Sequence, residues 1–117
     1  MKRHHLLDIY GVELHLATTR RDWAGLRRSF DFLDRDTPKE SFGHTTYATR
    51  RGGERHLIFW IDATRVGGDL VDTCAHEASH GAGRILECVG HRVPGTDEPH
   101  AYLVGWLTRW LWEAASA

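Results

Sequence analysis

Hydrophobic and polar positions recur along this chain with two periods, which predict a strand first and a helix after it. Val12, Leu14 and Leu16 alternate with Glu13 and His15, and this period of two predicts a half-buried strand within residues 7–18. A helix follows from a capping threonine at position 18 or 19 to about residue 33. Its apolar face repeats every three or four residues and contains Trp23, Leu26, Phe30 and Leu33.

Two further strands are predicted at residues 43–49 and 55–62. The segment between them contains Gly52-Gly53, and paired glycines between strand-like runs are typical of a hairpin turn that needs positive φ angles. The apolar run at residues 57–61 indicates a strand inside the sheet. Residues 34–41, with Pro38, and residues 62–69, with two glycines, are predicted loops.

Two helices complete the pattern. The first is predicted from about Asp69 to residue 89, ends at Gly90, and draws its apolar surface from Val71, Ala75, Ala78, Ala82, Ile85, Leu86 and Val89. Gly81 and Gly83 each cost such a helix about 1 kcal/mol relative to alanine, which indicates close approach of another element or room for a substrate. The last helix starts at residues 96–99 and continues to about residue 115, with a core stripe of Leu103, Leu107, Trp110, Leu111 and Ala114.

Composition limits the classes of function. The 117 residues fit one domain, and the net charge of −1 gives no bulk attraction to nucleic acid or to an anionic membrane. Cys74 and Cys88 are fourteen residues apart on one predicted helix, about 21 Å, so they cannot form a disulfide with each other. Free thiols, together with the lack of a signal peptide or a membrane-spanning run, predict a cytoplasmic protein.

The helix from Asp69 carries the pattern H-E-x-x-H in His76-Glu77-Ala78-Ser79-His80. The two histidines are four residues apart and therefore share one face, where both imidazoles can bind one Zn²⁺ ion. Zinc lowers the pKa of a bound water to about 7, and the neighbouring carboxylate of Glu77 can take its proton. The pattern therefore predicts metal-assisted hydrolysis, with Glu77 as the general base.

A hydrolytic zinc site needs a third protein ligand, and the sequence offers several. The metzincin continuation is excluded, because Leu86 stands where that pattern has its last histidine. His91 is eleven residues beyond His80, about 16 Å along a continuous helix. That is too far for both to bind one ion unless the glycines break the helix. Glu98, in the first turn of the last helix, is the favoured ligand, because that helix can fold back across the motif; Asp97 is the alternative.

Tyr102 lies one turn beyond Glu98 and points to the same face. Its hydroxyl could donate a hydrogen bond to a developing oxyanion or to a metal ligand, although a packing role suits it equally. His100 lies about 160° round the helix from Glu98, so it is predicted to be a surface residue. Nine histidines are many for this length, and the motif explains two of them.

In His76, Glu77, His80 and Glu98 the chain resembles the gluzincin-type minimal zincins, including the ImmA/IrrE and SprT-like peptidases. The likeness implies an α+β fold in the order β-α-β-β-α-α, with a small, mainly antiparallel, three-stranded sheet on one side and two helices holding Zn²⁺ on the other. Tyr102 departs from the Asp or Asn of that family. The stretch from Glu98 to Trp106 also resembles small H-E-x-x-H proteins encoded by tailed phages, which would place the protein in the host cytoplasm.

These observations predict a zinc-dependent peptidase that binds an extended peptide or protein substrate along the sheet edge. The alternative is a non-catalytic, zinc-stabilised binding or assembly module. Five tryptophans, three of them near the C-terminus, could contact a protein partner or a second copy of the chain. A DNA-associated protease is a third hypothesis. The chain has no basic patch and no zinc-ribbon cysteines to support it.

Overall fold

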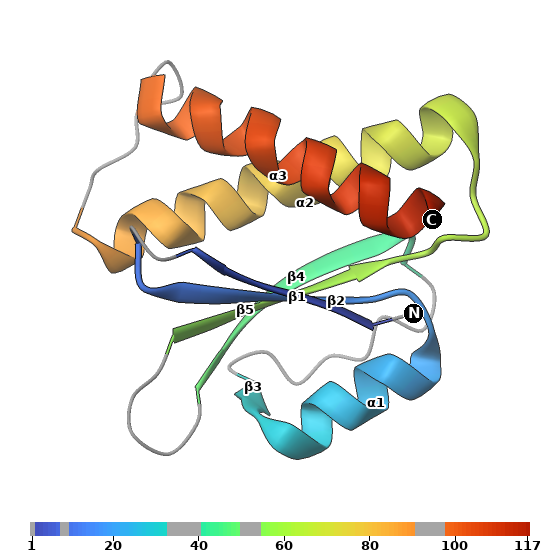
Figure 1. Cartoon of the computed structure of the whole chain (residues 1–117), viewed down its shortest axis with the longest axis horizontal. Coiled ribbons are helices and arrows are strands. Elements are labelled where there is room, and N and C mark those ends of the chain that lie inside the picture. Colours follow the sequence, from blue (N-terminus) through green and yellow to red (C-terminus); the bar gives the residue numbers. More distant parts are fainter. Residues whose placement is uncertain (1, 8–9, 33–40, 50–54, 91–97) are drawn as a thin grey trace.

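A computed structural model describes residues 2–7, 10–32, 41–49, 55–90 and 98–117 of the chain (Figure 1). Three helices and five strands follow one another within these ranges. In chain order they are β1 (Lys2–Leu7), β2 (Val12–Ala17), α1 (Arg20–Ser29), β3 (Asp31–Phe32), β4 (Gly43–Thr49), β5 (Arg55–Ile61), α2 (Gly67–Cys88) and α3 (Glu98–Ser116). The protein is therefore of the α+β class, as the sequence predicts.

The strands form one mixed sheet in the order β1-β2-β5-β4-β3. β2 and β5 are parallel, and the other neighbours are antiparallel. The prediction of three strands was wrong, because β1 and β3 are also present. β1 reads Lys-Arg-His-His-Leu-Leu and has no apolar alternation, while β3 is only two residues long. Neither strand carries a pattern that single-sequence reasoning detects.

The sheet separates two apolar layers (Figure 1). α2 and α3 cover one face, where the side chains of Leu14, Phe59 and Leu107 lie in the larger core. α1 covers the other face and forms a smaller core with Trp60 and Ile58 of β5. β5 is consequently buried on both faces from residue 56 to residue 61, which explains its unbroken apolar sequence.

α1 begins where the sequence predicts but ends four residues earlier. Thr19 caps it, since its hydroxyl accepts a 3.1 Å hydrogen bond from the Asp22 amide. The helix ends at Ser29, and Phe30 takes an extended conformation. The chain then enters β3, so the apolar spacing that predicts helix as far as residue 33 continues past the actual end of the helix.

α2 matches the predicted motif helix within two residues at its start and one at its end. Gly90 has a φ of +77°, which agrees with its predicted role as a helix stop. Val71 and Val89 were predicted to add to the apolar surface, but both are exposed. α3 runs antiparallel to α2, and its buried stripe consists of Leu103, Leu107, Leu111 and Ala115.

Gly81 explains how closely α2 packs on the sheet. A Cβ atom at this position would lie 2.6 Å from Cζ of Phe59, so only glycine fits without a shift of the buried ring. Gly83 has nothing within 4 Å of the corresponding position. The predicted close approach is therefore confirmed for Gly81 alone. None of the helices in the described ranges has an apolar stretch long enough to cross a membrane.

Candidate functional site

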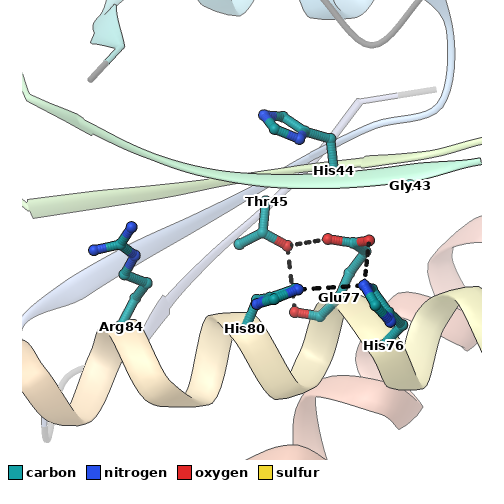
Figure 2. A pocket seen from close by; sticks show the side chains of 7 residues that line it. All are labelled: Gly43, His44, Thr45, His76, Glu77, His80 and Arg84. Carbon is teal, nitrogen blue, oxygen red and sulfur yellow. Dashed lines mark hydrogen bonds and ion pairs between the residues drawn. The ribbon is translucent and has the colours of Figure 1, made fainter. Parts of the chain in front are cut away.

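A pocket of about 300 Å³ lies between β4 and the middle of α2 (Figure 2). Two short segments line it, one from the strand and one from the helix. The lining residues are Gly43, His44, Thr45, His76, Glu77, His80 and Arg84. All three fixed residues of the H-E-x-x-H motif therefore line one pocket. The motif alone does not predict that β4 lies beside them.

The alternation of β4 determines which of its side chains face α2. Thr45 contacts Glu77 and Tyr47 contacts Cys88, both on α2, while His44 points away toward Trp23 of α1 (Figure 2). Gly43 lies on the α2 side, and a Cβ atom there would lie 2.8 Å from Cγ of Glu77. The missing side chain at Gly43 allows the glutamate to lie against the strand backbone.

His76 and His80 present their ring nitrogens to each other across one turn of α2. Their Nε2 atoms are 3.2 Å apart, and both side chains are on the exposed side of the helix. Two nitrogens bound at 2.0–2.1 Å to one tetrahedral zinc ion are separated by about 3.3 Å. The spacing of this pair is thus close to that of two ligands of one zinc ion, and it also corresponds to a hydrogen bond between the two rings.

Glu77 lies beside this pair but is almost fully buried, with 5% of its surface exposed. Oε1 accepts a 2.7 Å hydrogen bond from the hydroxyl of Thr45. Oε2 lies 4.0 Å from Nε2 of His76, on the pocket side. One carboxylate oxygen is therefore held by the strand, while the other faces the position between the glutamate and the histidines.

The structure does not bring Glu98 or Tyr102 into this pocket. Both side chains are exposed on α3, and neither is among the residues that line it. Within the part of the chain that the structure describes, no third His, Cys, Asp or Glu has a ligand atom within 4.8 Å of both His76 and His80. The other predicted ligands, His91 and Asp97, lie outside the described residues. The described pocket thus supplies two of the three expected ligands.

Next to the pocket, none of the described strands pairs with one side of β4. In the described segments, β3 pairs only with Ala48 and Thr49, so residues 43–47 have no strand neighbour on that side. An extended peptide can add to such an edge through backbone hydrogen bonds. The sequence predicts a substrate along an edge of the sheet, without indicating which strand.

The two cysteines do not belong to the pocket. Cys74 is fully buried, and burial raises the pKa of its thiol from 9.0 to about 11. Cys88 lies 3.2 Å from the hydroxyl of Tyr47, and both thiols are free. These contacts agree with the predicted packing role and with the absence of a disulfide between the two residues.

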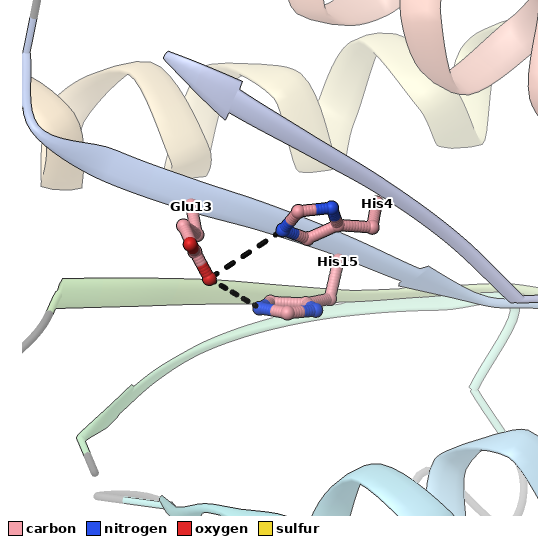
Figure 3. A group of neighbouring side chains, drawn as sticks. All are labelled: His4, Glu13 and His15. Atoms are coloured by element: carbon pink, nitrogen blue, oxygen red, sulfur yellow. Dashed lines mark ion pairs between the residues drawn. The ribbon is translucent and has the colours of Figure 1, made fainter. Parts of the chain in front are cut away.

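A second polar cluster was not found from the sequence. It lies on the other face of the sheet and joins His4, Glu13 and His15 (Figure 3). The alternation of Glu13 and His15 with apolar residues predicts that they share the face opposite the main core. Nothing in the local sequence, however, shows that His4 comes to the same place. Thr45 and Gly43 were missed for the same reason, because they meet Glu77 only through tertiary packing.

Comparisons of this chain with protein-family models, with curated proteins and with solved structures give no match. The inference of function therefore depends on the residues and their geometry.

Proposed function

We propose that the protein is a zinc-dependent peptidase in which His76 and His80 bind the metal and Glu77 acts as the general base. The observation that carries the proposal is the 3.2 Å spacing of the two Nε2 atoms, with Oε2 of Glu77 4.0 Å from one of them, in an open pocket. A purely structural zinc site has no use for a carboxylate in this position. The pocket therefore favours hydrolysis.

Glu77 and Thr45 have separate tasks in this proposal. A zinc ion supplies Lewis-acid chemistry and lowers the pKa of a water molecule. Oε2 of Glu77 takes the proton from that water and then passes it to the leaving amine. The Thr45 hydroxyl, bound to Oε1, keeps the carboxylate oriented toward the histidines. Burial of Glu77 limits its other orientations.

The substrate is proposed to be an extended peptide that pairs with residues 43–47 of β4. In this position its backbone runs past the histidine pair, because Thr45 lies directly over Glu77. Arg84 lines the same pocket and can bind a carboxylate of the substrate. Protein or peptide substrates with an accessible extended segment are thus the expected class.

Glu98 remains the proposed third ligand, from the resemblance to gluzincins, and Tyr102 a proposed hydrogen-bond donor. Glu98 lies at the start of α3, and Tyr102 is 79% exposed. Their participation therefore requires the first turns of α3 to approach His80 when metal binds.

A non-catalytic binding module is the second candidate, and the surface of α3 favours it. Tyr102 and Trp106 are both exposed, by 79% and 40%. Exposed aromatic side chains on one helix are enriched at protein interfaces. In this alternative, zinc at His76 and His80 stabilises the fold, and α3 contacts a protein partner or a second copy of the chain.

Glu77→Gln separates the two candidates. The amide keeps the shape of the side chain and an oxygen for the Thr45 hydrogen bond, but it cannot accept the proton. Cleavage of a quenched-peptide library should fall by about 10²–10⁴-fold, while zinc content stays at the native value. Glu113→Gln on α3 removes the same charge far from the pocket, and we expect it to cleave at the native rate.

Two results would reject the peptidase. One is cleavage by the Glu77→Gln protein at the native rate. The other is no cleavage by the zinc-loaded native protein, together with a biological activity that survives Glu77→Gln; this would favour the binding module.

A further inference from the structure

Three histidines surround one carboxylate oxygen on the face of the sheet opposite the pocket. Oε2 of Glu13 lies 3.4 Å from Nε2 of His4, 3.3 Å from Nδ1 of His56 and 3.9 Å from Nε2 of His15. Nε2 of His15 and Nδ1 of His56 are 3.0 Å apart. Figure 3 shows that the side chains of His4, Glu13 and His15 point to one place between the strands and α1.

The pairing of three strands assembles this cluster. His4 of β1 is directly opposite His15 of β2, and Glu13 of β2 is directly opposite His56 of β5. Residues opposite each other on neighbouring strands have side chains on the same face. The four residues therefore lie in paired strands of the sheet and in none of the loops.

Burial across the cluster changes from one side to the other. The side chains of His4 and Glu13 are 54% and 37% exposed, whereas those of His15 and His56 are 9% and 1% exposed. The ring of Phe30, at the end of α1, packs against both buried imidazoles. Its centroid lies 4.9 Å from that of His15 and 4.4 Å from that of His56. The cluster thus has one solvent-accessible side, through which an ion can enter, and one buried side.

We propose that His4, Glu13 and His15 bind a divalent transition-metal ion, with the buried His56 in contact with Glu13 and His15 behind them. The ligand atoms of the first three residues already lie within 4.8 Å of one another. Imidazole nitrogens suit zinc, nickel and copper, and the carboxylate offsets part of the charge of the ion. Oε2 of Glu13 lies 3.4 Å from Nε2 of His4 and 3.9 Å from Nε2 of His15, and two ligands of one tetrahedral zinc ion are about 3.3 Å apart. Small side-chain adjustments would therefore bring the three ligand atoms to one ion.

This site is separate from the pocket at His76 and His80. The pocket is lined by α2, whereas the cluster packs against Phe30 at the end of α1, and these two helices cover opposite faces of the sheet (Figure 1). It also has a different consequence. A metal at His4, Glu13 and His15 would link β1, an edge strand, to β2, so it would stabilise the N-terminal part of the sheet. The alternative is a cluster of hydrogen bonds with no affinity for metal.

The test uses protein without a histidine tag, since a tag would itself bind metal. Both pocket ligands are first removed in a His76→Ala/His80→Ala protein. After loading with Co²⁺ or Zn²⁺ and desalting, this protein should retain about one ion per chain. Adding His4→Ala should weaken binding by at least about 100-fold, more than the loss of an outer-shell partner usually does. Glu13→Gln should weaken it as well.

His5→Ala is the matched control. His5 is also an exposed histidine of β1, but its ring lies on the other face against Trp106. The two ring centroids are 5.1 Å apart. We expect this variant to bind metal with the affinity of its parent. A far-UV circular dichroism spectrum checks the fold of each protein, and the exposed position of His4 allows its replacement without a cavity.

The proposal fails if the His76→Ala/His80→Ala protein binds no metal, or if His4→Ala and His5→Ala have equal affinities. Should the double variant not fold, the metal content of His4→Ala in the otherwise native protein decides instead. It should be one ion per chain lower than that of His5→Ala, and equal contents would overturn the site. Loss of metal at this cluster leaves the pocket intact, so the two proposals fail independently.

Discussion

The Thr45 hydroxyl donates a 2.7 Å hydrogen bond to Oε1 of Glu77 and so connects β4 to α2 at the candidate site. The same hydroxyl lies 3.3 Å from the main-chain oxygen of Glu77. A nearly buried carboxylate needs such a partner, because an unpaired polar group away from water is costly. This contact therefore affects both the stability of the fold and the orientation of the proposed general base.

Thr45→Val should lower the free energy of unfolding by about 1–3 kcal/mol, because valine keeps the volume of the side chain but leaves the Glu77 oxygen without its donor. Urea denaturation monitored by tryptophan fluorescence measures the change. Thr45→Ser retains the hydroxyl and should lie much closer to the native value. Equal stability of the valine and serine variants would show that the hydrogen bond contributes nothing.

Gly81→Ala and Gly83→Ala should change stability in opposite directions, although they lie two residues apart on α2. At Gly81 the new methyl group would lie 2.6 Å from Cζ of Phe59, and overpacking of this kind costs about 1–3 kcal/mol. At Gly83 nothing lies within 4 Å, so alanine should stabilise the helix by up to about 1 kcal/mol. Thermal unfolding of both variants tests the pair, and a stabilising Gly81→Ala would contradict the close packing.

The main elements around the pocket could be predicted from the sequence because each has a local signal. The alternation at Val12–Leu16 corresponds to β2, the two strand-like runs to β4 and β5, and the long apolar helix with Gly90 after it to α2. The predicted Gly52-Gly53 turn lies outside the described residues. The H-E-x-x-H motif places His76 and His80 on one helical face through spacing alone. These features depend only on the residues within one element.

The remaining features depend on contacts between distant residues. Thr45 meets Glu77 across 32 positions of sequence, and His15 meets His56 across 41. The first contact depends on how α2 packs on β4. The second depends on strand register, which is set by the assembled sheet. The polar strand β1 was missed because its partner β2 supplies the apolar face. The position of Glu98 relative to His80 likewise depends on helix packing, which the sequence spacing does not determine.

Alkaline pH should destabilise the protein through Cys74 and Tyr47. Burial raises the pKa of the Cys74 thiol to about 11, and burial followed by the contact with Cys88 raises the pKa of the Tyr47 hydroxyl to about 12. The native state therefore holds these protons more tightly than the unfolded chain. Their contribution is complete below about pH 9 and is lost as the pH rises through 11 and 12.

Urea midpoints at pH 8 and pH 10.5 measure this loss, which should be smaller in a Cys74→Ala protein, even though its overall stability is lower. Native-state alkylation followed by mass spectrometry gives a second measurement. Cys74 should react much more slowly than Cys88, because it is fully buried and because the thiolate is the reactive form. Equal rates for the two thiols in the folded protein would contradict the buried environment of Cys74.

Glu98→Gln tests whether α3 completes the metal site of the pocket. If Glu98 becomes the third ligand, zinc affinity should fall by at least about 10-fold, since a hydrolytic site depends on three protein ligands. The measurement is a competition with a chelator in a His4→Ala background, which removes the second proposed site. Glu113→Gln is the matched control, because Glu113 is an exposed acid of α3 that pairs with Arg109 at 2.8 Å.

Hydrogen exchange at the start of α3 should also slow when zinc is added to the Glu113→Gln protein but not to the Glu98→Gln protein. Unchanged affinity and exchange in Glu98→Gln would leave His76 and His80 as the ligands from the described pocket and would direct the search for the third to His91 and Asp97.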